Sequence, residues 1–369
     1  MQKQAGVRNS AMELLRIISM IMIIFHHFAV HGGFEFGVSL SATHFWYNFI
    51  IMGGKVGVNI FVLISGYYLI DSNKETLNII KIVKFVGQIW FYSVTIFIIG
   101  ILTGIIDFRP QDIINTIFPI TFSGWWFAST YFVLYLLHPY LNKLLHNISK
   151  GLYQKLLLLL VICWSIIPTF TSSYFQSNSL LWFFTLYAIA GYIKLYGANA
   201  RFSAKHYFVM FLTSSILTYS TSVVIMVAGN KGMLLGSITS FYGQEKLTVL
   251  LISLSLFMCF ATLRMSYSKI INTLASATFG VYLIHDSNIL RSFLWIDLFE
   301  NAKYQESLFL IPYSIIVVTI VYIVCTLIDL LRINLIEKPC MKIIDGYSGM
   351  VVARFENLAT SFKNFIFGK

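Results

Sequence analysis

The sequence predicts an all-α integral membrane protein with about ten transmembrane helices. Of its 369 residues, 57% are hydrophobic and 11% are charged, whereas soluble domains carry about 25% charged residues. The apolar segments follow one another without a polar stretch long enough to form a separate soluble domain. Basic residues concentrate in alternate loops, as expected of a chain that crosses a membrane repeatedly and is oriented by its loop charges.

Each predicted helix meets the requirement of about 20 mostly apolar residues for crossing a bilayer. The first apolar run contains Glu13 and Arg16 and lacks a small-residue cleavage site, so we expect it to be retained as a helix rather than removed as a signal peptide. The predicted helices are 12–30, 46–70, 83–106, 125–146, 155–171, 179–196, 206–228, 247–264, 274–292 and 308–332.

Loop charge predicts the direction of these helices. Nineteen basic residues fall in one alternate set of loops and the termini, against five in the other set, which favours a cytoplasmic location for both termini. The larger set is Lys3, Arg8, Lys74, Lys81, Lys84, Lys143, Lys150, Lys155, Lys194, Arg201, Lys205, Arg264, Lys269, Arg332, Lys338, Lys342, Arg354, Lys363 and Lys369. Because the net charge of +11 is scattered over short loops, it does not indicate a nucleic-acid partner.

Two domains follow from this pattern: a ten-helix membrane domain over 1–332 and a short basic cytoplasmic tail over 333–369. Within the tail, 346–367 forms either a basic amphipathic segment on the inner leaflet or a frayed end. The four cysteines are interpreted as structural, without a disulfide framework, and we predict no metal site.

Arg16 and His27 are the leading functional candidates, because ionisable residues are costly inside a membrane-spanning helix. Eleven residues separate them, which is roughly 1100° of helical rotation, three turns plus about 20°. The two side chains therefore share one face, about 16 Å apart along the helix axis. The neighbouring His26 points about 80° away, and we interpret it as a packing or interfacial residue.

Further polar residues are candidate substrate ligands, each with a structural alternative. Lys55 and Asn59 lie in the second predicted helix, where Lys55 could instead extend to the membrane surface as an anchor. His285 and Asp286 lie near the outer end of the ninth, at a depth similar to that of His27. They form either part of the site or an interfacial hydrogen-bonding pair.

The chemistry of the first pair fits acyl transfer. Histidine has an ordinary pKa of about 6.5, so it can act as a general base toward a hydroxyl or carry the acyl group itself. Arginine binds phosphates through forked hydrogen bonds. The helix would then present a phosphate ligand at its cytoplasmic end and a base near its outer end.

Five segments resemble membrane acyltransferase family 3, the polytopic sugar O-acyltransferases. Arg16, ten intervening residues and His27 match the family's first-helix signature, and 57–67 (GVNIFVLISGY) is similar to its glycine-rich helix. The segments 125–142 (WWFASTYFVLYLLHPYLN), 278–286 (TFGVYLIHD) and 337–339 (EKP) resemble three later motifs. Many members carry Asp where this chain has Asn59.

The resemblance implies acetyl-coenzyme A as a donor substrate, with no bound cofactor, and a polysaccharide or lipid-linked sugar as acceptor. It implies a multi-pass protein of the bacterial inner or plasma membrane, with His27 as base or acyl carrier. Ser65 and Gly66 would allow a close helix approach, and Ser65 is a further candidate substrate ligand. We expect no soluble acyltransferase domain after the last helix, and this expectation, together with the bias toward Ile, Phe, Lys and Asn, favours the exopolysaccharide- or capsule-modifying branch. A homo-oligomer or a glycan-synthesis complex is an expected assembly.

Two other classes of function compete with an enzyme. Intramembrane polar residues could line the path of a glycan exporter, although no inverted repeat is visible. The chain could also be a catalytically silent assembly protein of a glycan-synthesis complex, which the presence of both Arg16 and His27 disfavours.

Overall fold

The computed structural model describes residues 8–37, 39–72, 77–171, 173, 175, 177–197, 202–233 and 237–368, and these contain helices and connecting turns but no strand. Four of the basic residues used for the topology, Lys3, Lys74, Arg201 and Lys369, lie outside this part of the chain. The helices are α1 (Ser10–Val30), α2 (Ala42–Leu69), α3 (Ile79–Leu102), α4 (Pro110–Ile117), α5 (Trp126–Asn147), α6 (Lys150–Val161), α7 (Ile167–Phe170), α8 (Ser179–Tyr196), α9 (Ala204–Asn230), α10 (Leu247–Thr262), α11 (Lys269–Ser276), α12 (Thr278–His285), α13 (Leu290–Ser292), α14 (Leu310–Arg332), α15 (Lys338–Gly346) and α16 (Ser348–Phe367).

Among the described residues, seven helical segments are long and apolar enough to cross a membrane. They comprise α1, α2, α3, α8 and α9, together with Lys150–Phe170 and Leu310–Gly346, in which short π-helical turns join successive α-helices. These seven correspond to seven of the ten predicted ranges. Two further ranges correspond to α5, which contains Pro139, and to α10, which has 16 residues.

The prediction of one continuous helix over 274–292 is wrong. The chain forms α11 and α12, which break at Ala277, and α12 ends at His285. Around the break, Ser276 Oγ donates to the carbonyl of Thr273 and Thr278 Oγ1 donates to that of Ala275. Such local side-chain bonds compete with the regular helical backbone pattern. The early end of α12 places Asp286 in a turn, where its side chain faces α1.

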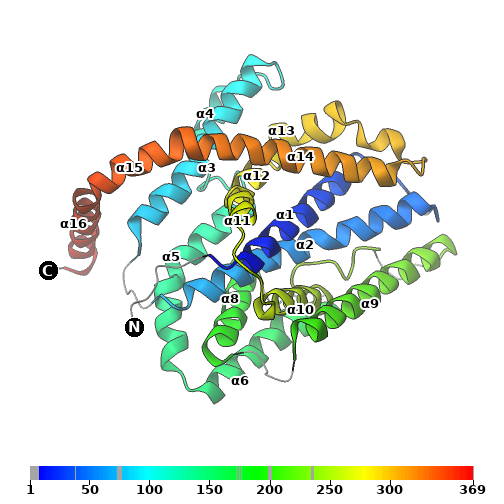
Figure 1. The fold of residues 1–369 in the computed structure, drawn as a ribbon, viewed down its shortest axis with the longest axis horizontal. Coiled ribbons are helices and arrows are strands. Elements are labelled where there is room, and N and C mark those ends of the chain that lie inside the picture. The colour runs from blue at the N-terminus through cyan, green and yellow to red at the C-terminus, as the bar shows by residue number, and fades with distance from the viewer. Residues whose placement is uncertain are drawn as a thin grey trace.

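Helix α1 lies in the middle of the bundle and contacts α2, α10, α11, α12 and α14 (Figure 1). It runs beside α2, and the two pack closely because α2 presents glycines to α1. A Cβ atom added at Gly57 would lie 2.6 Å from the carbonyl oxygen of Ser19. At Gly66 it would lie 3.1 Å from Cα of Tyr187 in α8, so the close approach expected at Gly66 is present. Small residues allow such backbone approach between membrane helices.

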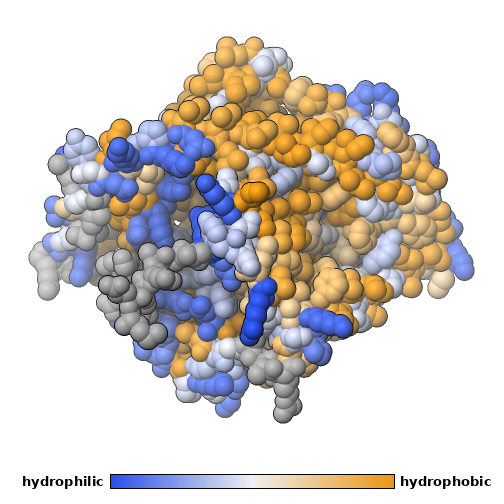
Figure 2. Space-filling view, viewed as in Figure 1, coloured by the Kyte–Doolittle hydropathy of each residue, from blue (hydrophilic) through white to orange (hydrophobic). Residues whose placement is uncertain are grey.

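The helical path continues beyond the predicted domain boundary at residue 332. A π-helical turn over Ile333–Glu337 joins α14 to α15, and both run across one side of the bundle (Figure 1). At this junction the buried Asp329 accepts hydrogen bonds from Tyr92 Oη and Arg332 Nε, both at 2.7 Å. Much of the outer surface over α14 and α9 is hydrophobic (Figure 2), as expected for contact with lipid.

Candidate functional site

A cavity of about 300 Å³ runs between α1 and α2 and contains both members of the leading pair. On α1 its lining residues are Arg16, Met20, Ile23, His26 and His27. Four of these residues are spaced three to four positions apart, namely Arg16, Met20, Ile23 and His27, and they therefore lie on one face of the helix. The structure thus brings Arg16 and His27 into one cavity, at opposite ends of an apolar stretch. We call this the central cavity.

Helix α2 supplies the facing wall. Lys55, Val58, Phe61 and Ser65 line the cavity at helical spacing. Because α2 runs antiparallel to α1, Gly54 faces His26 while Gly57 faces Ser19 and Ile23. Lys55 therefore lies toward the His27 end and Ser65 toward the Arg16 end.

The central cavity has a positive lining. Its described lining residues include Arg8, Arg16 and Lys55 but no aspartate or glutamate. Near its wall, Arg16 Nη1 donates to both carboxylate oxygens of Glu13, at 2.8 and 3.0 Å. This pair holds the guanidinium in place while about a quarter of the Arg16 side chain, 27%, stays exposed. The cavity therefore suits an anionic ligand with a narrow apolar portion.

His27 is connected to His285 by a hydrogen bond that determines its reactive nitrogen. Nδ1 of His285 lies 2.6 Å from the carbonyl oxygen of Val281, which can only accept, so Nδ1 carries the proton. In neutral His285, Nε2 is then an acceptor. It lies 2.9 Å from Nδ1 of His27, which must donate. Neutral His27 consequently has an unprotonated Nε2, which is the nitrogen required of a general base.

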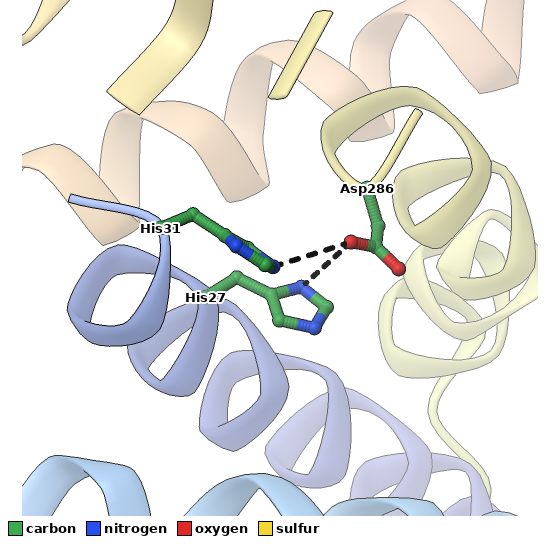
Figure 3. Close-up of side chains that lie close together, drawn as sticks. All are labelled: His27, His31 and Asp286. Atoms are coloured by element: carbon green, nitrogen blue, oxygen red, sulfur yellow. Dashed lines mark ion pairs between the residues drawn. The ribbon is translucent and has the colours of Figure 1, made fainter. Parts of the chain in front are cut away.

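Asp286 lies beside this pair, at the end of α12. Its Oδ1 is 3.7 Å from Nδ1 of His27 and 3.8 Å from Nε2 of His31, and Figure 3 shows both rings directed toward this carboxylate. Arg291 Nη1 approaches the same oxygen to 3.6 Å. These separations are too long for strong hydrogen bonds but close enough for electrostatic stabilisation of a protonated His27.

The same three residues are the set among the described residues that could serve as metal ligands. Nδ1 of His27, Nε2 of His31 and a carboxylate oxygen of Asp286 lie within 4.8 Å of one another. His27 Nδ1 already has a hydrogen-bond partner in His285. The prediction that the chain uses no metal stays a prediction.

Lys55 and His26 flank His27. Nζ of Lys55 lies 5.0 Å from the centre of the Trp126 ring, a cation–π contact that holds the ammonium group at the cavity wall. His26 also lines the cavity, although its position on the helix differs from that of His27. Its Nδ1 donates to the carbonyl oxygen of Ile51, at 2.8 Å, so its ring is anchored to α2.

Asn59 lies apart from the other candidates. It is fully buried and does not line the central cavity. Its side-chain amide donates to the carbonyl of Gln244 at 2.8 Å, and its oxygen accepts from the Trp182 indole at 3.0 Å. These bonds join α2, α8 and the segment before α10, which is the geometry of a structural residue.

Two arginines and a histidine at the site, Arg8, Arg291 and His31, are not among the sequence candidates. His31 follows His27 by four residues, the spacing that places two side chains on one helical face, so this signal was available. Arg291 approaches Asp286 because the chain turns after His285. The prediction of a continuous helix over 274–292 does not contain this turn. Arg8 was counted only as a loop charge.

Comparison with known proteins gives one finding. A family model described as an acyltransferase domain matches residues 9–330. This range covers most of the chain and includes every residue of the site except Arg8. No curated protein and no solved structure was found to match.

Proposed function

The chain belongs to this acyltransferase family, membrane acyltransferase family 3, and on that premise we propose that it transfers an acetyl group from coenzyme A to a glycan hydroxyl. The donor enters from the cytoplasm, and the acceptor is an extracytoplasmic polysaccharide or its lipid-linked precursor. Family membership makes the chain an acyltransferase and its apolar helices make it a membrane protein. The donor, acceptor and orientation are our proposals.

One observation supports this proposal above the others: a single positively lined cavity contains both Arg16 and His27. Coenzyme A has phosphates at one end and the acyl thioester at the other, joined by a narrow arm. The two residues are about 16 Å apart along α1, with the apolar Met20 and Ile23 between them. Arg16 then binds phosphate and the arm carries the thioester to His27.

The reaction proceeds by general base catalysis at His27. Nε2 of His27 takes the proton of the acceptor hydroxyl as the oxygen attacks the thioester carbonyl carbon. The tetrahedral intermediate then collapses, the carbon–sulfur bond breaks, and the departing thiolate receives that proton from His27. The products are the acetyl ester and free coenzyme A. His285 accepts from Nδ1 throughout, and Asp286 stabilises the imidazolium.

Lys55 is placed to stabilise the negative oxygen of the intermediate. Its ammonium lies at the His27 end of the cavity, against the Trp126 ring. A fixed positive group near the developing charge lowers the barrier, and more so where water is excluded. Ser65 and Tyr131 line the other end of the cavity, where they contact the donor.

The cellular setting follows from the charge of the loops. In a bacterial plasma membrane with both termini in the cytoplasm, Arg16 faces the acetyl-coenzyme A pool and His27 faces the outer surface, and the excess of basic residues in one set of loops supports this orientation. The acceptor is an exopolysaccharide or capsular glycan, and the enzyme acts within a glycan-synthesis complex or as a homo-oligomer.

Mass spectrometry of the surface polysaccharide, with and without this gene, tests the proposal. The enzyme predicts a polysaccharide of unchanged amount that lacks O-acetyl groups in the deletion strain. Loss of the polysaccharide itself would instead favour the exporter, and unchanged acetylation would contradict the proposed acceptor.

A further inference from the structure

A second cavity opens where the N-terminal end of α1 meets α11 and the junction of α14 with α15. It measures about 670 Å³, and we call it the basic cavity. Hydrophilic residues gather on this side of the molecule, over α15 and the adjoining part of α3 (Figure 2). Its charged lining residues are Arg8, Lys84, Lys269, Arg332, Glu337, Lys338, Lys342 and Asp345.

The basic cavity adjoins the central cavity at the end that is farther from His27. Arg8 and Ser276 line both cavities. Arg8 lies eight residues before Arg16. Arg8 is therefore at the boundary of the two cavities, and Arg16 is in the central cavity, which also contains His27. A ligand can therefore occupy both cavities at once.

Part of the positive charge is neutralised within the protein. Arg332 pairs with Asp329 at 2.7 Å and with Glu337 at 2.8 Å. Lys84 pairs with Glu337 at 2.6 Å, so this carboxylate is shared by two cations. These ion pairs hold the wall of the cavity in place, and the paired Arg332 and Lys84 are not available to bind a ligand.

Four lining cations have no ion pair to a carboxylate in the described part of the chain. One of them, Lys338, donates to the side-chain oxygen of Asn334 at 2.7 Å, and Arg8, Lys269 and Lys342 remain for a ligand. All three are exposed. They come from the segment before α1, from the first residue of α11 and from α15, so three separate elements converge on one space. Convergent unpaired cations are the usual means of binding phosphate.

We propose that the basic cavity binds the phosphorylated nucleotide end of the donor, and that Arg8, Lys269 and Lys342 recognise its 3′-phosphate. This inference rests on the proposed function, since it assumes that coenzyme A is the donor. The diphosphate lies at the junction near Arg16, and the arm extends through the central cavity to His27. Phosphate recognition is thereby divided between two sites, which distinguishes coenzyme A from thioesters that lack the 3′-phosphate.

The test compares equilibrium binding of coenzyme A and 3′-dephospho-coenzyme A to the purified full chain in lipid nanodiscs. Wild-type protein is expected to bind coenzyme A about ten-fold more tightly, since one charged hydrogen-bonded contact has roughly that effect. The double variant K269Q/K342Q should bind both ligands with the weaker affinity. The control K155Q/K363Q removes the same charge from exposed positions outside both cavities and should retain the preference.

The outcomes separate the subsite from the proposed function. Equal affinity of the wild type for the two ligands would overturn the subsite while leaving acetyl-coenzyme A as the donor. If neither coenzyme A nor 3′-dephospho-coenzyme A binds, both the subsite and the proposal that acetyl-coenzyme A is the donor are overturned. The assignment of these residues would also be overturned if K269Q/K342Q still bound coenzyme A more tightly than 3′-dephospho-coenzyme A. It would be overturned as well if the control K155Q/K363Q lost this preference to the same extent. The wild-type comparison requires no variant, so it stands even if a substitution impairs folding.

Discussion

Nδ1 of His27 lies 2.9 Å from Nε2 of His285, although the two residues are 258 positions apart in the chain. The carbonyl of Val281 fixes the proton on the far nitrogen of His285, and this in turn leaves Nε2 of His27 free to accept a proton. His285 is thus a positioning residue for His27: it sets the tautomer and orientation of the base without itself lining the central cavity.

Replacing His285 by Leu should reduce kcat for acetyl transfer by about ten-fold or more, the effect of one lost hydrogen bond. The KM for acetyl-coenzyme A should stay unchanged, because His285 does not contact the donor. His285→Gln retains an acceptor near the position of Nε2 and should recover much of kcat. A purely structural role would predict instead that both variants lose folded protein and that the remaining molecules keep normal kcat.

Chelation should leave the activity unchanged. His27, His31 and Asp286 could form a metal site by distance, but the base mechanism assigns Nδ1 of His27 to His285. We therefore expect kcat in EDTA to equal that in untreated membranes. Activity that disappears on chelation and returns with Zn²⁺ would assign the three residues to a metal and remove His27 as a free base.

Gly57→Ala should destabilise the protein, because the added methyl group would lie 2.6 Å from the Ser19 carbonyl oxygen and force α1 away from α2. Overpacking of this kind costs about 1–3 kcal/mol. Gly87→Ala in α3 is the matched control, since a Cβ atom there meets nothing within 4 Å. Thermal unfolding in detergent should show a lower Tm for the first variant only; equal Tm values would contradict the close packing.

Asn59→Ala should lower stability without lowering the activity of each folded molecule. The substitution leaves the buried Trp182 indole and Gln244 carbonyl without a partner, at a cost of about 1–3 kcal/mol. The check is Tm together with kcat and KM normalised to folded protein. An increased KM at unchanged Tm would restore Asn59 as a substrate ligand.

The sequence was most informative about long apolar helices and residues that share one helix. Hydrophobic length predicted seven ranges that the structure contains as long apolar helices, and helical spacing placed Arg16 and His27 on one face. Hydrophobic length gave the wrong result over 274–292, because an apolar pattern does not reveal hydrogen bonds from Ser and Thr side chains to the preceding backbone. For the same reason the sequence did not predict the turn that brings Asp286 toward His27, or the position of Arg291.

Contacts between distant helices could not be predicted from spacing. The bond from His27 to His285 depends on how α12 packs against α1, and the burial of Asn59 depends on Trp182 in α8. Resemblance to the family identified the segments that hold these residues. It did not identify their partners, which follow from the tertiary packing alone.

The most direct test of the account is acetyl transfer from labelled acetyl-coenzyme A to surface glycan by membranes that contain the His27→Ala variant. The control is His206→Ala, which removes an exposed histidine that hydrogen-bonds to Ser203 near the start of α9, with both variants compared at equal protein abundance. Loss of the general base should reduce the rate by about 10²–10⁴-fold, while the control keeps the wild-type rate. A wild-type rate in His27→Ala would contradict the central claim that this histidine is the catalytic base.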